Sequence, residues 1–130
     1  MKVVVEQEYD ETGELEELTW DLIPVVSATK TTHLDSSGLP KVGTVLEPGM
    51  PIVGKIGKTK AYDAASEPDC LELHGLRFEE LQEKYGHMWR DSSLYATEAM
   101  TGVVTEAYWE PGRHGLRAVV VIDPISAKIR

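Results

Sequence analysis

The chain has 130 residues, a formal net charge of −9 at pH 7 and 42% hydrophobic residues, which is typical of one globular domain. Its single cysteine, Cys70, cannot form an internal disulfide, and no apolar run reaches the roughly 18 residues that cross a bilayer. We therefore expect a cytoplasmic protein without membrane contact. The acidic balance excludes a broad duplex-binding surface, because phosphates require neutralising lysine and arginine. Any contact with nucleic acid is expected to be local.

Acidic side chains are concentrated at the start of the chain. Residues 1–24 hold eight acids against a single base, Lys2. Such a run is typical of a solvated hairpin or edge strand, and the alternative is a docking site for a basic partner. The sequence favours the solvated hairpin and leaves the alternative open.

The first half of the chain carries strand signals. Residues 2–9 are β-branched and then alternate, which predicts a strand, and Gly13 supplies a turn. Residues 15–23 are predicted to pair back as the second strand of a hairpin, which ends at Pro24. Residues 39–57 alternate short apolar runs with glycine and proline, a pattern that builds small curved barrels.

The middle of the chain carries the helical signal. Residues 58–65 are polar and aperiodic, which predicts a mobile loop, and Ser66 is placed to cap a helix with Asp69 three residues later. Residues 76–89 have apolar side chains at helical spacing. These residues are the candidate partner-binding set: Leu76, Phe78, Leu81, Tyr85, Met88 and Trp89.

That apolar stripe has two interpretations. An amphipathic helix usually packs on its own domain, in which case the stripe is core. The alternative is an exposed face that receives a partner. Periodicity alone leaves both open.

The end of the chain returns to strands. Residues 101–109 alternate, residues 110–112 have turn chemistry, and residues 116–122 form a strongly apolar strand. The fold class is therefore mainly β (α+β), a small β barrel or sandwich with a protruding helical tip. The two β halves are expected to pair with each other, because neither has enough strands to close a core alone. The valines expected to be buried are Val53, Val103, Val119 and Val121.

Three blocks, in this order, resemble the flap region of RNA polymerase beta subunits. Residues 42–55 (VGTVLEPGMPIVGK) are similar to the family pattern VGxxVxPGDxLVGK, and residues 90–94 (RDSSL) are similar to KD(S/T)SLR. Residues 101–104 (TGVV), followed by 117–123 and 128–129, resemble SGTVxxV and RVxVAxxRKIxxGDK. Each block alone is common, and their shared order and spacing make the resemblance specific.

The resemblance also covers the N-terminal part, with some departures. Residues 13–24 are similar to the segment that leads into this domain, and residues 34–38 to its LDEEGIV loop. Met50 replaces the aspartate of PGD, and residues 95–97 replace the usual arginine and proline. The tip also lacks the LLRAIFG pattern. These departures indicate a divergent polymerase, such as one encoded by a large bacteriophage.

The resemblance implies a single flap domain over residues 1–130, with a barrel at 2–57 and 92–130 and a flap tip at about 58–91. It implies a non-catalytic segment of a DNA-directed RNA polymerase, a nucleotidyltransferase. Such a segment walls the RNA exit channel, so nascent RNA passes nearby. It contacts other polymerase subunits, and its tip helix docks sigma-like initiation factors or elongation factors.

A second hypothesis is a barrel-sandwich carrier or scaffold domain of the biotinyl or lipoyl type, which shares the Pro-Gly turn and Gly-Lys strand. Such carriers need an exposed lysine at a hairpin tip, within a motif such as Met-Lys-Met, and this chain has none. It also lacks a DxDxD carboxylate cluster for magnesium. Cys70 and His74 lack the further ligands that zinc requires. We therefore predict no catalytic residue, no metal site and no cofactor in this segment.

Overall fold

The computed structural model describes residues 1–124. The strands are β1 Lys2–Glu6, β2 Glu17–Leu18, β3 Val45–Leu46, β4 Pro51–Val53, β5 Lys55–Lys58, β6 Trp89–Asp91, β7 Leu94–Tyr95, β8 Gly102–Pro111 and β9 Leu116–Asp123. The α-helices are α1 Cys70–Gly75 and α2 Phe78–Tyr85, and the short 3-10 helices are η1 Ala28–Lys30, η2 Ala64–Ser66, η3 Gly86–Met88 and η4 Glu98–Met100. None of the helices described is long and apolar enough to cross a membrane.

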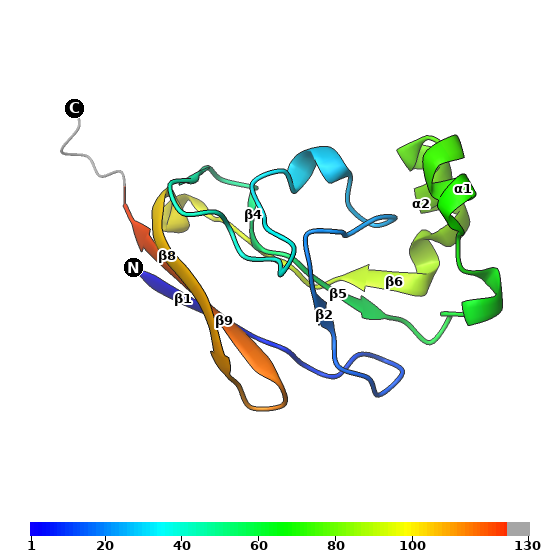
Figure 1. The fold of residues 1–130 in the computed structure, drawn as a ribbon, viewed down its shortest axis with the longest axis horizontal. Helices are drawn as coiled ribbons and strands as arrows, with labels where there is room; N and C mark the ends of the chain where they lie inside the picture. Colours follow the sequence, from blue (N-terminus) through cyan, green and yellow to red (C-terminus); the bar gives the residue numbers. More distant parts are fainter. Residues whose placement is uncertain (125–130) are drawn as a thin grey trace.

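The largest sheet joins the two ends of the chain. Its strand order is β1-β9-β8-β3, and every pairing in it is antiparallel. The long hairpin of β8 and β9 forms its centre, and β1 adds to the outer edge of β9 (Figure 1). The apolar strand predicted at residues 116–122 is therefore β9, and the strand predicted at the N-terminus is β1.

Two smaller sheets complete the body. One has the order β2-β5-β6, and the other pairs β4 with β7. The pairs β1–β9, β3–β8, β4–β7 and β5–β6 each join a strand that precedes the helices to one that follows them. The prediction that the two β halves pair with each other is confirmed, as is the mostly β fold with a helical tip.

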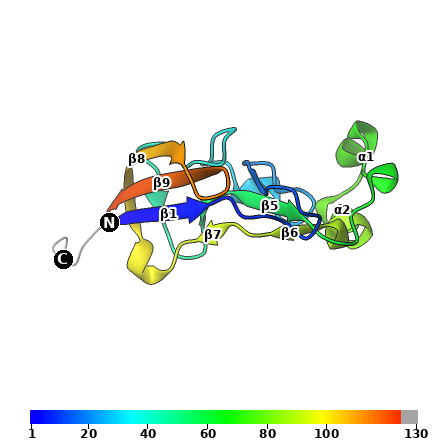
Figure 2. The ribbon, with the colours of Figure 1, turned by 90° about the horizontal axis from the view of Figure 1, so that it is seen from below.

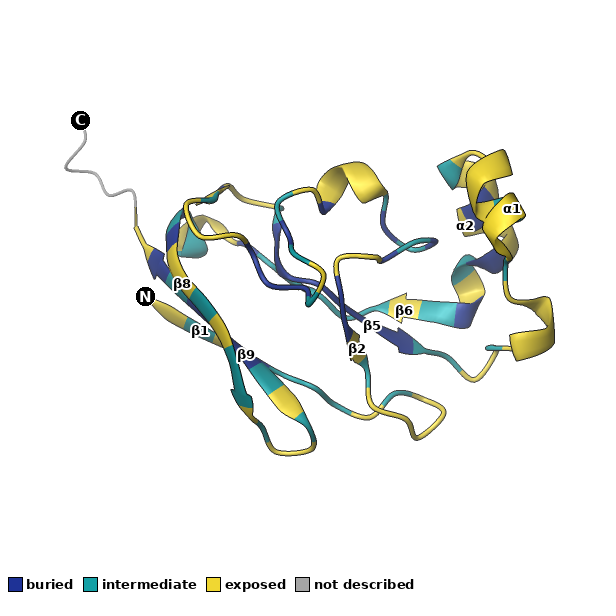
Figure 3. Ribbon diagram, viewed as in Figure 1, coloured by how far each residue is buried: buried dark blue, intermediate teal, exposed yellow. Residues whose placement is uncertain are grey.

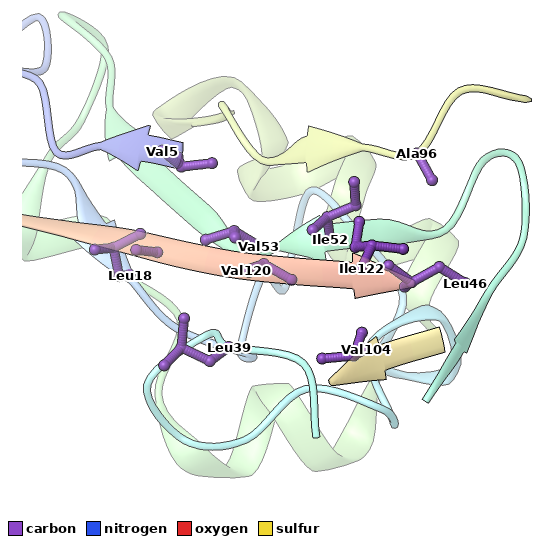
Figure 4. Packing of buried hydrophobic residues seen from close by; sticks show 11 residues of the cluster. Val5, Leu18, Leu39, Leu46, Ile52, Val53, Ala96, Val104, Val120 and Ile122 are labelled. Carbon is purple, nitrogen blue, oxygen red and sulfur yellow. The ribbon is translucent and has the colours of Figure 1, made fainter. Parts of the chain in front are cut away.

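One hydrophobic core serves both halves (Figure 4). Its buried members are Val5, Leu18, Leu39, Leu46, Ile52, Val53, Ala96, Val104, Ala118, Val120 and Ile122. Val53 and Val119 are fully buried, as predicted. The prediction was wrong for Val103 and Val121, which are half-buried. Side chains alternate along a strand, and it is their neighbours Val104 and Val120 that face this core.

The predicted strand at residues 15–23 is also corrected. The turn exists, since Tyr9 bridges Leu15, but β2 has two residues and pairs with β5 instead of β1. The Thr19 hydroxyl then accepts a hydrogen bond from the Asp21 amide at 3.0 Å. A local bond of this kind competes with a strand ladder, so the chain leaves the sheet after Leu18.

The two α-helices lie at one end of the molecule, opposite the β1-β9-β8 sheet, in both ribbon views (Figures 1 and 2). α1 has no buried residue and is the more exposed of the two helices (Figure 3). The predicted helix at 76–89 is divided into α2 and η3, and Trp89 already belongs to β6. The expected cap at Ser66 is wrong, because Asp69 caps α1 by accepting a hydrogen bond from the Glu72 amide.

Candidate partner-binding tip

A two-stranded stem carries the helices. β5 leads outward and β6 leads back, with Lys58 directly opposite Trp89. The Thr59 amide donates to the Met88 carbonyl at 3.0 Å, and the Thr59 hydroxyl donates to the His87 carbonyl at 2.6 Å. The chain therefore leaves the body and returns to it side by side. We call residues 59–88 the tip.

The outgoing segment of the tip packs around the ring of Tyr62. This ring meets Trp89 edge-on at 5.5 Å between centroids, and the Lys58 ammonium lies 4.6 Å from its centre. The Tyr62 hydroxyl donates to the Glu67 carboxylate at 2.8 Å, and this bond raises the pKa of the Tyr62 phenol. The polar segment at 58–65, which the sequence predicted to be a mobile loop, thus has an aromatic anchor.

Glu72 links the two α-helices. Its carboxylate accepts hydrogen bonds from the Tyr85 hydroxyl and, at 3.2 Å, from the Lys84 ammonium. These bonds, with the Tyr85 bond the larger cause, lower the pKa of Glu72. The carboxylate is therefore the form that holds α1 against α2.

The apolar face of α2 is packed inside the tip. Leu81, Tyr85 and Met88 have 2%, 5% and 2% of their surface exposed. They form a cluster with the partly buried residues Ile23, Tyr62, Leu76 and Trp89. The hypothesis that this stripe faces solvent is wrong for the three buried residues, because the chain's own segments cover them. Whether the predicted six residues bind a partner stays a prediction.

The accessible apolar surface of the tip lies elsewhere. Among the predicted residues, Leu76, Phe78 and Trp89 are half-buried and keep part of their surface free. Two leucines of α1 are more exposed, with 83% for Leu71 and 38% for Leu73. Sequence reasoning missed both, because a six-residue helix is too short for a period of 3.6 to be evident.

The motif residues beside the stem have structural partners. The Lys55 ammonium is buried and lies 2.8 Å from the Glu16 carboxylate, and it donates to the Glu6 carbonyl at 3.0 Å. The Ser93 hydroxyl accepts from the Lys55 amide at 2.9 Å. Asp91 accepts from the Tyr95 hydroxyl, and burial, followed by this bond, raises the pKa of Tyr95. Lys55 of the VGK block and Ser93 of the RDSSL block therefore hold β5 against the segment that follows β6.

Within residues 1–124, no three histidine, cysteine, aspartate or glutamate side chains gather where they could hold a metal ion. Cys70 is exposed on α1. Residues 128–129, which belong to the third resemblance block, lie outside the described residues.

The structure is that of a mainly β domain in which strands before and after the helices pair with each other, and a helical tip extends from a two-stranded stem. Residues 1–123 match the family described as RNA polymerase Rpb2, domain 6. The chain therefore belongs to this family of RNA polymerase subunit domains.

The curated relatives agree with this membership. The DNA-directed RNA polymerase subunit beta of each of two strains of Porphyromonas gingivalis is 38% identical to the chain over 93 residues. The match covers 71% of this chain and 7% of each relative. The chain thus corresponds to a small part of the length of a beta subunit.

Proposed function

We propose that the chain is the flap segment of the beta subunit of a DNA-directed RNA polymerase and that it acts without catalysing a reaction itself. In this role it walls the RNA exit channel and contacts other polymerase subunits. The observation that supports the proposal most directly is the family match over residues 1–123. The helical tip adds support, because it lies between the VGK and RDSSL blocks, where the flap tip lies in the family that the sequence resembles.

The tip is the part that docks initiation or elongation factors in this proposal. Leu76 and Phe78 of the tip and Trp89 at its base offer partly exposed apolar surface, and Leu76 and Trp89 pack against the buried residues Leu81, Tyr85 and Met88. An aromatic or leucine anchor that loses water on binding typically contributes about 2 kcal/mol or more to an interface. The relatives reported above are bacterial, and a phage origin stays a prediction.

The test uses the complete polymerase that contains this chain in its beta subunit. A tagged beta subunit should co-purify with the other large subunits, and RNA synthesis should require them. Replacing the tip, residues 59–88, by a short glycine linker should leave elongation on a preformed RNA–DNA scaffold unchanged and abolish factor-dependent initiation. Wild-type initiation by the tipless enzyme would contradict the docking role, and RNA synthesis by the purified chain alone would contradict the non-catalytic role.

The carrier hypothesis now has an observation against it. A carrier lysine must be accessible to a modifying enzyme, whereas Lys55 of the Gly-Lys strand has 7% of its surface exposed and is paired with Glu16. Intact-mass measurement of the native protein distinguishes the two functions. A biotinyl or lipoyl mass increase would favour the carrier, and an unmodified mass favours the polymerase segment.

A further inference from the structure

A groove lies where the tip meets the body. It is a hollow of about 430 Å³ between α1 and the segment that follows β2. Its apolar lining includes Trp20 and Ile23 from that segment, Leu73 from α1 and Trp89 from β6. We call these four residues and the space between them the base groove. Its volume falls within the range of about 300–1,000 Å³ that is usual for binding sites.

Two apolar side chains of the base groove are exposed to solvent. Trp20 has 41% of its surface exposed and Leu73 has 38%, and neither belongs to a hydrophobic cluster of the described residues. Trp20 also lines a second hollow of about 540 Å³, so this one side chain contributes to both depressions. Exposed apolar side chains gathered from distant segments mark an interaction surface.

The rim of the base groove is acidic. Glu17, Asp21 and Glu67 line it together with His74, and no lysine or arginine does so in the part of the chain that the structure describes. Glu17 and Asp21 form no ion pair within residues 1–124, whereas Glu72, elsewhere on the tip, is paired with Lys84. Unpaired carboxylates around an apolar hollow attract a cationic partner and repel the phosphates of a nucleic acid.

We propose that the base groove binds a cationic amphipathic peptide segment of a protein partner. A large apolar side chain of that segment lies between Trp20 and Leu73, and its lysine or arginine residues face Glu17 and Asp21. This is the helix-in-groove mode of recognition, with charge on the rim selecting the partner. The inference rests on the proposed docking function and deepens it, because it names the surface and the chemistry of the partner.

The experiment uses the full chain and a synthetic amphipathic peptide with a leucine–phenylalanine stripe flanked by lysines. Trp20 and Trp89 line the base groove, so intrinsic tryptophan fluorescence reports binding directly. Saturable binding with a blue-shifted emission is expected at low salt. A matched peptide with glutamate in place of lysine should bind at least tenfold more weakly. Equal binding of the two peptides, or stronger binding of a single-stranded RNA oligonucleotide, would overturn the proposal.

Matched variants locate the site. Leu73→Ser should weaken peptide binding about tenfold or more, while Leu71→Ser should leave it unchanged, because Leu71 lies on the same helix outside the groove with 83% of its surface exposed. Reversing the rim charge with Glu17→Lys and Asp21→Lys should abolish the preference for the lysine peptide. Equal losses from Leu73→Ser and Leu71→Ser would refute the groove as the site.

Two further measurements distinguish loss of binding from loss of folding, and failure of the base groove from failure of the docking function. Thermal melts identify any variant that unfolds, and if Leu73→Ser does so, Trp20→Ser takes its place, because Trp20 is outside the buried clusters. In that case Trp20→Ser, with binding followed through the remaining Trp89 of the groove, must weaken binding tenfold for the proposal to stand. If no peptide binds while factor-dependent initiation still requires the tip, the base groove is refuted and the docking function survives.

Discussion

Leu81→Ala is the substitution that most directly tests how the tip is built. Leu81 has 2% of its surface exposed and packs against Tyr85 and Met88. The substitution removes three carbon atoms from this cluster, which at about 0.8 kcal/mol each costs about 2.5 kcal/mol in transfer free energy. The cavity left behind adds to this cost, and measured leucine-to-alanine changes span about 2–5 kcal/mol. We expect a loss of about 3 kcal/mol in the free energy of unfolding.

The assay is thermal unfolding followed by circular dichroism. For a chain of this size, about 4 °C of melting temperature corresponds to each kcal/mol, so Leu81→Ala should melt about 12 °C below the wild type. Phe78→Ala is the matched control, because Phe78 lies one turn earlier on α2, is half-buried and belongs to no buried cluster of the described residues. It should cost less than about 1 kcal/mol.

Hydrogen exchange shows where the stability is lost. The buried members of the cluster around Leu81, which are Leu81, Tyr85 and Met88, all belong to the tip, so the tip can open without unfolding of the body. Faster exchange in α2 with unchanged exchange in β9 would show that Leu81 stabilises the tip locally. The reasoning is refuted if Leu81→Ala melts within about 2 °C of the wild type and the amides of α2 keep their protection.

Three further predictions concern Lys55, Glu72 and two glycines. Lys55→Met should cost about 3–5 kcal/mol in urea denaturation, because it leaves the carboxylate of Glu16, whose side chain is only 11% exposed, without its cation, and adding Glu16→Leu should recover most of that loss. The lowered pKa of Glu72 means that its stabilising contribution is complete above the ordinary value of 4.5 and is lost as the pH falls through the folded-state pKa. Melting curves of the wild type and Glu72→Gln should therefore differ at neutral pH and converge in acid, and a constant difference would contradict this. Gly54→Ala should destabilise by about 1–3 kcal/mol, because the added Cβ would lie 2.1 Å from a backbone carbonyl oxygen. Gly75→Ala meets no atom within 4 Å and should be neutral or stabilising by up to about 1 kcal/mol, so equal melting temperatures for these two glycine variants would be the contrary result.

Much of the body could be predicted from the sequence, because its strands are set by local pattern. The β-branched runs at both ends of the chain specify β1 and β9, and the short apolar runs between glycines specify β3, β4 and β5. The family resemblance rests on the same blocks, and the family match covers residues 1–123. The pattern could not say which of two adjacent valines faces the core, so Val103 was predicted to be buried where Val104 is the buried residue.

The tip was harder to predict because its contacts are not local. An apolar stripe shows that one face of a helix has to be buried, but it does not show which residues bury it. Here Ile23 and Tyr62, one of them more than fifty residues before α2, cover Leu81. The burial of Lys55 escaped prediction for the same reason, since its partner Glu16 lies across a sheet pairing that the predicted hairpin did not contain.

The pairing of Lys58 with Trp89 has a consequence for how this domain can change in evolution. The excursion between these residues begins and ends at one rung of the β5–β6 ladder, so its length does not affect the path of the body. A segment with adjacent ends can be exchanged at little cost in chain entropy. A different tip can therefore be grafted onto the body between Lys58 and Trp89, provided that the graft supplies an apolar partner for Ile23.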